Sequence, residues 1–198
     1  MGLSTKVAHG VAKLPGVPAP RPYNLTVGRG FVWFRVAKVG TRTILSLLED
    51  VSDEGDGTLR RKYQLGFYRR SYKFAFVRNP WARAVSAWQD KAIEHSYIPA
   101  VTFEQFVDML ATEDLSTCDP HWRRQTALID LEALDFLGRL ERFDDDLLTV
   151  LDRLGIDRSI PHRNRSGHGD YRDAYSARTR AIVADLYAED IARFGYDF

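Results

Sequence analysis

Two stretches of the chain share one order of hydrophobic and polar positions: a short apolar run, a polar loop and then apolar residues at helical spacing. In the first stretch, residues 31–36 (Phe-Val-Trp-Phe-Arg-Val) are aromatic or β-branched, which is typical of a strand. A loop follows at residues 37–43. Beyond the loop, apolar residues recur on one helix face, at Ile44, Leu45, Leu47, Leu48 and Val51. The pattern predicts a strand, a loop and a helix.

The second stretch repeats this order. Residues 73–77 (Lys-Phe-Ala-Phe-Val) predict a buried strand. Asn79 is a favourable N-cap and Pro80 suits the first helical position. Apolar residues at helical spacing then follow, at Trp81, Val85, Trp88 and Ala92. We therefore expect a helix from residue 80 to about residue 94.

The remaining segments continue the alternation of strands and helices. We expect a weak strand or helix at residues 63–68, a helix capped by Thr102 through residue 110, a long loop at 114–125, a short strand at 134–137, a helix at 144–154, a loop at 155–174 and an amphipathic helix at 175–194. Alternating strands and helices predict an α/β fold with a mainly parallel sheet.

The N-terminal residues differ from the rest of the chain. Four prolines lie there, at positions 15, 18, 20 and 22, and five glycines lie in the first 30 residues. Proline and glycine disfavour regular structure, so we expect residues 1–29 to form an extended arm. The length of 198 residues fits one domain, and we place that domain at residues 30–198.

Charge and cysteine content exclude several classes of protein. The 28 basic and 27 acidic residues nearly cancel, so no overall basic field would attract nucleic acid, and any anion site must be built locally. The single cysteine, Cys118, excludes an internal disulfide framework. The sequence has neither a signal-peptide-like apolar segment at its start nor an apolar run long enough to span a bilayer. We expect a soluble, cytoplasmic protein that binds no nucleic acid and does not insert into a membrane.

Both predicted strand-to-helix junctions carry groups that bind anions. Unpaired N–H groups and the helix dipole favour phosphate or sulfate at a helix start. The first junction adds Lys38, Gly40, Thr41, Arg42 and Thr43. The usual phosphate-loop signature places its Lys after the second Gly, whereas Lys38 precedes Gly40, which weighs against an ordinary ATP or GTP site. A solvated Lys38 and a Thr43 that only caps the helix are the alternative.

At the second junction, Arg78 ends the predicted strand and Ser86 lies two turns into the helix. A phosphate there could accept hydrogen bonds from the Arg78 guanidinium and the Ser86 hydroxyl. The alternative is that Ser86 is only a small residue at a crowded packing position.

The sequences of these segments resemble motifs of sulfotransferases that use 3′-phosphoadenosine 5′-phosphosulfate (PAPS). Residues 35–43 (Arg-Val-Ala-Lys-Val-Gly-Thr-Arg-Thr) resemble their 5′-phosphosulfate loop. Residues 76–91 resemble the motif F-V-R-x-P-x-x-R-x-x-S-A-[YW]-x-x-K of the carbohydrate sulfotransferase family. That family includes chondroitin 4-sulfotransferases and, more distantly, heparan 2-O-sulfotransferases. Residues 119–125, 138–141 and 190–196 are similar to three further segments of that family, in the same order.

This resemblance implies a P-loop-like three-layer α/β fold, with a central mainly parallel sheet flanked by helices. It also implies an enzyme that transfers a sulfuryl group from PAPS to an acceptor hydroxyl, on a carbohydrate or a glycosylated small molecule, and releases adenosine 3′,5′-bisphosphate. The donor would be held by Arg35, Lys38, Gly40, Thr41, Arg42, Thr43, Arg78 and Ser86. Lys38 would stabilise charge on the departing phosphate. Asn164 and Arg165 could cover the nucleotide, and a solvated basic loop is the alternative there.

The acceptor hydroxyl must lose a proton, and histidine is the usual base near neutral pH. We choose His121, which lies in the D-x-H-W segment, and the alternative is a structural histidine that bonds the backbone of its loop. Asp53, Glu54 and Asp56 are the fallback bases. No metal is expected, because in-line sulfuryl transfer needs positioning and charge stabilisation rather than a metal. A nucleotide kinase with a degenerate phosphate loop and a non-catalytic module for anionic glycans remain alternatives, and the sequence does not give the oligomeric state.

Overall fold

A five-stranded sheet lies at the centre of the computed structural model, which describes residues 21–52, 59–63, 65–94, 101–160 and 169–198. The strands are β1 (Arg21–Gly28), β2 (Phe31–Phe34), β3 (Leu59–Tyr63), β4 (Tyr72–Val77) and β5 (Phe136–Arg139). They lie in the order β3-β1-β2-β4-β5. β2, β4 and β5 pair in parallel, whereas β1 is antiparallel to both β2 and β3. All strands except β1 therefore point the same way, which confirms the mainly parallel sheet.

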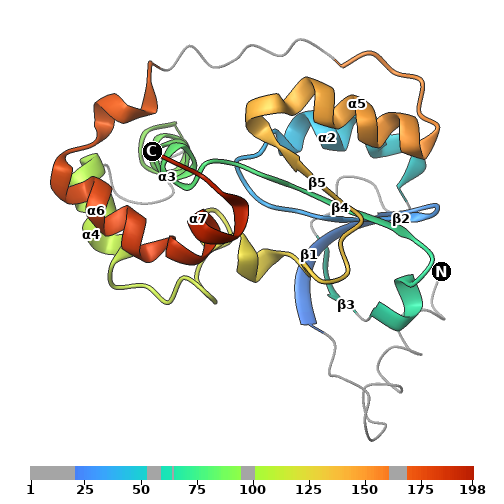
Figure 1. Ribbon diagram of the computed structural model, residues 1–198, viewed down its shortest axis with the longest axis horizontal. Coiled ribbons are helices and arrows are strands. Elements are labelled where there is room, and N and C mark those ends of the chain that lie inside the picture. The colour runs from blue at the N-terminus through green and yellow to red at the C-terminus, as the bar shows by residue number, and fades with distance from the viewer. Residues whose placement is uncertain (1–20, 53–58, 64, 95–100, 161–168) are drawn as a thin grey trace, which may run out of the picture.

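The described helices are α2 (Thr41–Leu48), α3 (Pro80–Trp88), α4 (Phe103–Leu110), α5 (Phe143–Leu154), α6 (Ala177–Leu186) and α7 (Ala188–Phe194). α2 and α5 lie on one face of the sheet (Figure 1), and their apolar residues share a core with β2 and β4. The α/β class with a central sheet flanked by helices is thus confirmed. Among the described residues, no helix has the length and apolar character needed to cross a bilayer.

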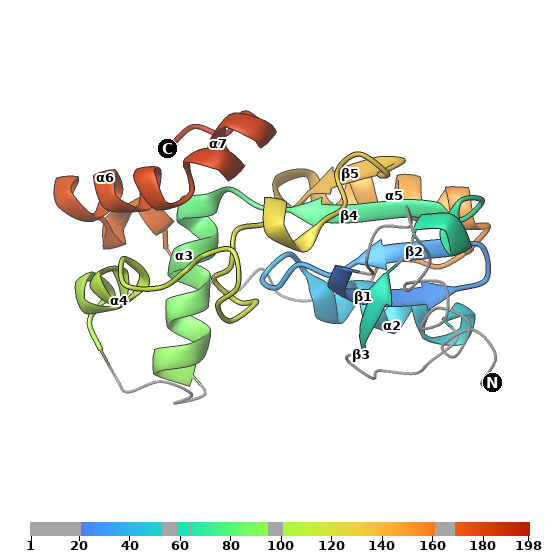
Figure 2. The ribbon, with the colours of Figure 1, turned by 90° about the horizontal axis from the view of Figure 1, so that it is seen from below.

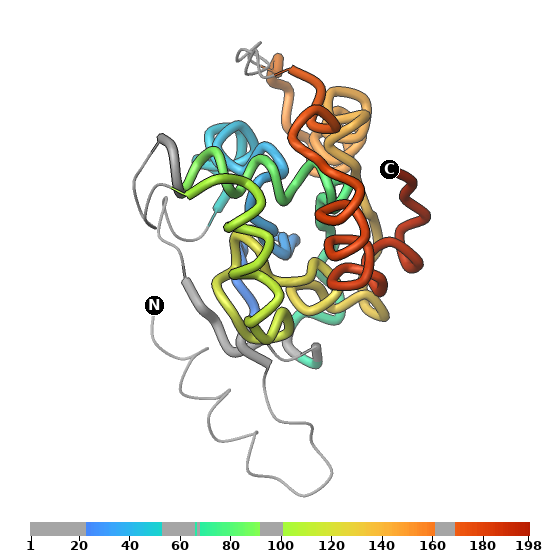
Figure 3. Tube along the Cα trace, turned by 90° about the vertical axis from the view of Figure 1, so that its left-hand side faces the viewer, coloured from blue at the N-terminus to red at the C-terminus, as the bar shows by residue number. Residues whose placement is uncertain are grey.

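A second helical group stands beside the carboxyl end of β4. α3 leads from that strand into a cluster with α4 and α6 (Figure 2), and these three helices pack against one another. The cluster has its own apolar core, which includes Trp81, Phe106 and Tyr187. When the left-hand side of Figure 1 faces the viewer, α4, α6 and α7 lie in front of the sheet (Figure 3). The site loops described below therefore run between two cores.

The helix starts follow the capping signals of the sequence. The Asn79 side chain accepts hydrogen bonds from the N–H groups of Trp81 and Ala82, with Pro80 at the first helical position. Thr102 forms a capping box with Gln105 at the start of α4. The predicted α3 also continues beyond Trp88, as a π-helical turn at Gln89–Glu94.

The prediction that residues 1–29 contain no strand is wrong for β1. A two-residue turn, with Gly30 at φ 82°, joins β1 to β2. The alternation of Tyr23, Leu25 and Val27 with polar residues fits a strand, and the prolines obscured that signal. Pro22 lies near the start of β1, where a strand tolerates proline best. Residues 1–20 lie outside the described part of the chain.

The prediction of one helix at residues 175–194 is also wrong. The helix is interrupted at Tyr187, which separates α6 from α7. The buried Tyr187 hydroxyl donates a hydrogen bond to the Trp122 carbonyl oxygen, and the next helix buries Asp190. The interruption therefore serves tertiary contacts that a hydrophobic pattern does not encode.

Gly138 in β5 offers a test of the packing between β5 and β4. A Cβ added there would lie 2.4 Å from Cε1 of Phe76, which is fully buried in β4. We expect Gly138→Ala to lower the free energy of unfolding by about 1–3 kcal/mol in urea denaturation followed by circular dichroism. At Gly169 the added Cβ would lie 3.7 Å from its nearest neighbour, so the matched Gly169→Ala variant should change that free energy by less than about 0.5 kcal/mol. Equal effects of the two variants would contradict this packing.

Candidate functional site

The site lies where the parallel strands end. β2, β4 and β5 are neighbours that run in the same direction, so the loops that follow them meet at one edge of the sheet. This edge is where open parallel sheets place their ligands. Lys38 follows β2, Arg78 follows β4 and Glu141 follows β5.

The loop after β2 has an unusual backbone. Lys38 has φ 71° and Gly40 has φ 81°, both in the left-handed region, and Lys38 is the only residue other than glycine with positive φ in the described chain. Left-handed residues beside right-handed ones turn successive N–H groups toward one side, which suits an anion. The Thr41 hydroxyl donates a hydrogen bond to the Val36 carbonyl oxygen at 3.0 Å and closes the loop on itself. Such left-handed backbone at a non-glycine residue is typical of functional loops.

Gly40 is required here for two reasons. Its φ of 81° disfavours a side chain, and a Cβ would lie 2.6 Å from Cε2 of Phe143 in α5. As the N-cap of α2, Gly40 also lacks a side chain that could cover the N–H groups of the first turn. That turn carries no acidic residue, so the helix dipole is left available to an anion.

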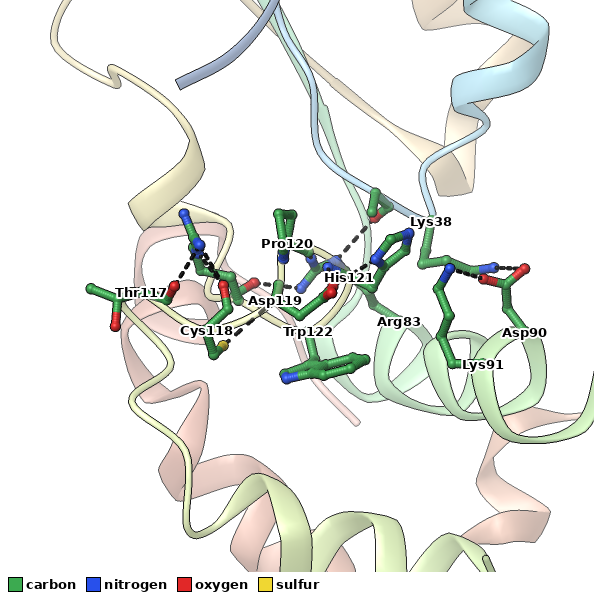
Figure 4. A network of polar contacts seen from close by, with 12 residues as sticks. Lys38, Arg83, Asp90, Lys91, Thr117, Cys118, Asp119, Pro120, His121 and Trp122 are labelled. Atoms are coloured by element: carbon green, nitrogen blue, oxygen red, sulfur yellow. Dashed lines mark hydrogen bonds and ion pairs between the residues drawn. The ribbon is translucent and has the colours of Figure 1, made fainter. Parts of the chain in front are cut away.

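The Lys38 side chain belongs to a cluster of charges. Its Nζ lies 3.4 Å from Asp90 Oδ1, and Lys91 Nζ lies 3.4 Å from the other Asp90 oxygen (Figure 4). The side chains of Lys38 and Asp90 are only 18% and 13% exposed. Burial acts to raise the pKa of Asp90, but the two ammonium groups outweigh it and hold that pKa below its usual value. Asp90 is therefore a carboxylate beside the predicted catalytic lysine.

Arg78 joins the loops that follow β2 and β4. Its guanidinium donates to the Lys38 carbonyl oxygen at 3.4 Å. Its backbone N–H donates to the Gln125 side chain at 2.9 Å, and that amide donates back to the Arg78 carbonyl oxygen at 2.9 Å. Burial lowers the pKa of Arg78, yet arginine keeps its charge at any physiological pH. A fixed cation thus lies next to the Lys38 loop.

Arg83 is almost fully buried, at 1% exposure, and lies one turn into α3. Its guanidinium donates to the carbonyl oxygens of Ala37 at 3.1 Å, Pro120 at 3.0 Å and Arg123 at 2.8 Å. Burial lowers the pKa of Arg83 as well. This one side chain therefore holds the Lys38 loop and the loop at residues 114–125 together.

His121 lies in that second loop, beside the cluster of charges. Its Nδ1 is 2.6 Å from Asp119 Oδ1, and its backbone N–H donates to the same oxygen at 2.8 Å. When Nδ1 carries the proton that Asp119 accepts, the neutral ring keeps a lone pair on Nε2. Figure 4 shows Nε2 turned away from Asp119, toward the loop that carries Lys38.

The pKa of His121 lies below its ordinary value. Burial of the imidazole lowers this pKa more than the hydrogen bond and charge of Asp119 raise it. The ring is therefore neutral at neutral pH and able to accept a proton. The His121 side chain remains 33% exposed, so a ligand can reach it.

The structure brings together only part of the predicted site. It gathers Lys38, Gly40, Thr41, Arg78 and His121 at one edge of the sheet. Thr43 lies in the first turn of α2, Ser86 is partly exposed on α3, and Arg42 is exposed on α2. Arg35 has its guanidinium carbon 5.7 Å from the centre of the Trp33 ring. Asn164, Arg165 and the fallback bases Asp53, Glu54 and Asp56 lie outside the described residues.

Sequence reasoning missed the partners of the two central side chains. Asp90 and Asp119 both lie within the motif segments, and the spacing of Asp119 two residues before His121 was an available signal for the second. No local signal connects Asp90 to Lys38, because that contact joins distant segments. Among the described residues, no three His, Cys, Asp or Glu side chains gather as a metal site would require.

Comparison with known proteins gives these groups a family context. A model of the sulfotransferase family matches residues 23–197. Carbohydrate sulfotransferase 12 of Mus musculus is 27% identical over 166 residues, which cover 63% of this chain and 40% of that relative. Carbohydrate sulfotransferase 14 of Danio rerio is 29% identical over 118 residues, which cover 46% of this chain and 32% of that relative.

The matched part of the chain thus corresponds to less than half the length of these relatives. No solved structure matches the chain. The family model nevertheless spans nearly the whole sequence, including every strand-end loop described above. This chain therefore belongs to the sulfotransferase family.

Proposed function

We propose that the protein is an enzyme that transfers a sulfuryl group from PAPS to a hydroxyl of a carbohydrate acceptor. The observation that carries this proposal is the left-handed loop at Lys38 and Gly40, with the Arg78 guanidinium bound to it, in a chain of the sulfotransferase family. The names of the relatives support a carbohydrate acceptor. A cytoplasmic location stays a prediction.

The residues of the site suit such a donor. Backbone N–H groups at Gly40 and the first turn of α2 would hold the 5′-phosphosulfate, with Thr41, Arg42 and Thr43. Arg78 and Ser86 would hold the 3′-phosphate, for which the buried guanidinium offers a paired, charge-assisted contact. Arg35 and the loop residues Asn164 and Arg165 complete the proposed donor site. Bound PAPS supplies an activated sulfuryl group with a phosphate as its leaving group.

The chemistry left to the protein is positioning, charge stabilisation and one proton transfer. The acceptor oxygen forms a bond to sulfur as the bond from sulfur to the bridging oxygen breaks, and adenosine 3′,5′-bisphosphate leaves. The Lys38 ammonium stabilises the charge that develops on the bridging oxygen. His121 Nε2 takes the acceptor proton, and Asp119 stabilises the imidazolium that results.

Nucleotide binding tests the proposal most directly. In titration calorimetry, adenosine 3′,5′-bisphosphate should bind far more tightly than ATP, because Arg78 and Ser86 recognise the 3′-phosphate. Tight ATP binding with Mg²⁺-dependent phosphoryl transfer would point to a kinase instead. Binding of sulfated glycans with no nucleotide preference would point to a non-catalytic module. Radiolabelled PAPS with a panel of carbohydrate acceptors then tests transfer itself.

Ser86→Ala sharpens this test. Loss of a hydrogen bond to a charged phosphate should weaken binding of the bisphosphate about tenfold and leave binding of adenosine 5′-monophosphate unchanged. Ser46→Ala is the matched control, because the Ser46 hydroxyl bonds only the Thr43 carbonyl oxygen within α2 in the described structure. Equal losses for both nucleotides would argue against a 3′-phosphate contact at Ser86.

Two variants at Lys38 separate its backbone from its ammonium group. Lys38→Ala and Lys38→Gly should both fold and both lose sulfuryl transfer. At φ 71°, glycine avoids the strain that alanine keeps, so Lys38→Gly should be more stable than Lys38→Ala by about 1 kcal/mol in urea denaturation. Turnover retained in either variant refutes the catalytic role, and equal stability refutes the strain.

The pH dependence of kcat/KM tests His121. Because burial holds its pKa below 6.5, activity should fall only as the pH drops below 6.5, where the base becomes protonated. Asp119→Asn removes the group that raises this pKa, so the acid limb should move to still lower pH. The plateau should fall about 10²-fold, because the tautomer is no longer fixed. Asp108→Asn on α4 is the control, and an unmoved acid limb in Asp119→Asn would contradict the assignment.

A further inference from the structure

Arg83 connects two loops with different roles in the proposed chemistry. One carries Lys38, which stabilises the leaving group, and the other carries His121, which accepts the proton. It donates to the carbonyl oxygen of Ala37, the residue before Lys38, and to that of Pro120, the residue before His121. A third bond reaches the Arg123 carbonyl oxygen, further along the second loop. Figure 4 shows Arg83 behind His121, between Asp119 and the Lys38 loop.

We propose that Arg83 is a positioning residue that sets the placement of the His121 imidazole relative to the Lys38 ammonium. This inference rests on the proposed function. Both carbonyl oxygens bind one planar guanidinium, whose N–H directions are fixed relative to one another. The two loops therefore cannot shift independently while all three bonds persist.

The side chain has no freedom to play a looser role. Arg83 is 1% exposed and points from a helix that is itself anchored by the Asn79 cap. A buried cation without hydrogen-bond partners is strongly unfavourable, so the fold keeps all three carbonyl oxygens in contact with the Arg83 guanidinium. Lysine could keep the charge but not the planar fork, and its ammonium could not match the three directions.

The alternative is that Arg83 only stabilises the fold. Loss of stability alone would lower the amount of folded enzyme without changing the properties of each folded molecule. Misplacement of reacting groups by about 1 Å lowers the rate constant for chemistry about 10²-fold. A positioning role therefore predicts a lower kcat in the folded protein, relative to its nucleotide affinity. A purely stabilising role predicts that both stay at the wild-type value in the folded protein.

The test compares Arg83→Lys with Arg178→Lys, a matched change at an exposed arginine that pairs with Glu104 and Asp108. We expect Arg83→Lys to lower kcat about 10- to 100-fold. Calorimetric affinity for adenosine 3′,5′-bisphosphate should fall much less than kcat, because Arg78 and the start of α2 at Gly40 remain. The Arg178→Lys variant should match the wild type in both.

Hydrogen exchange and NMR give readouts that need no turnover. Amide exchange in Arg83→Lys should speed up in residues 35–40 and in residues 118–125 together, relative to the rest of the chain. The imidazole of His121 should titrate closer to its ordinary pKa of 6.5, because a looser loop is better hydrated. These readouts stay decisive if the wild type transfers no sulfuryl group, so failure of the proposed function and failure of this inference are distinguishable.

Unchanged kcat with unchanged exchange in both loops would overturn the proposal, as would faster exchange in only one loop. If Arg83→Lys does not fold, two other measurements decide the question. They are the kcat of Arg83→Gln and the rotation rate of the Arg83 guanidinium in the wild type. Slow rotation of the Arg83 guanidinium in ¹⁵N NMR, with loss of kcat in a folded Arg83→Gln, supports the proposal. Free rotation of that group in the wild type overturns it.

Discussion

A buried guanidinium imposes the central constraint on this protein. Arg83 has left water almost completely, so its charge must be satisfied by oxygen atoms within the fold. The oxygens come from the backbone of two loops that are distant in sequence, at Ala37 and at Pro120 and Arg123. If either loop took another path, the buried Arg83 guanidinium would lose hydrogen-bond acceptors.

A second buried polar side chain, that of Asp190, holds the end of the loop at residues 114–125. Asp190, fully buried in α7, accepts hydrogen bonds from the backbone N–H groups of Gln125 and Thr126 at 2.8 and 2.9 Å. Gln125 in turn pairs with the backbone of Arg78. The segments that resemble sulfotransferase motifs thus meet in space, although they lie far apart in sequence. Glu141 repeats this pattern, because it accepts from the Asn79 N–H and from the Tyr196 hydroxyl.

The local parts of this arrangement could be predicted from the sequence, and the contacts between distant parts could not. Hydrophobic period and caps indicated the strand-loop-helix units around Lys38 and Arg78 and the helix after Thr102, because these depend on neighbouring residues. The strand β1 was missed because proline outweighed a short alternation. The Lys38–Asp90 pair was missed because it depends on where the π-helical turn after α3 lies relative to the loop after β2, which no local pattern records.

The arginines also explain how a chain of net charge +1 can offer an anion site. Arg83 and Arg78 bind the carbonyl oxygens of Ala37 and Lys38, which are consecutive in the loop. In a trans peptide the N–H points opposite to the carbonyl, and the described chain has no cis peptide. The N–H groups of Lys38 and Val39 are therefore turned away from the two arginines. The same bonds hold Lys38 in its left-handed conformation, at a cost of about 1–2 kcal/mol for a residue with a side chain. Buried cations thus act twice here, through their own field and through the peptide groups that they orient.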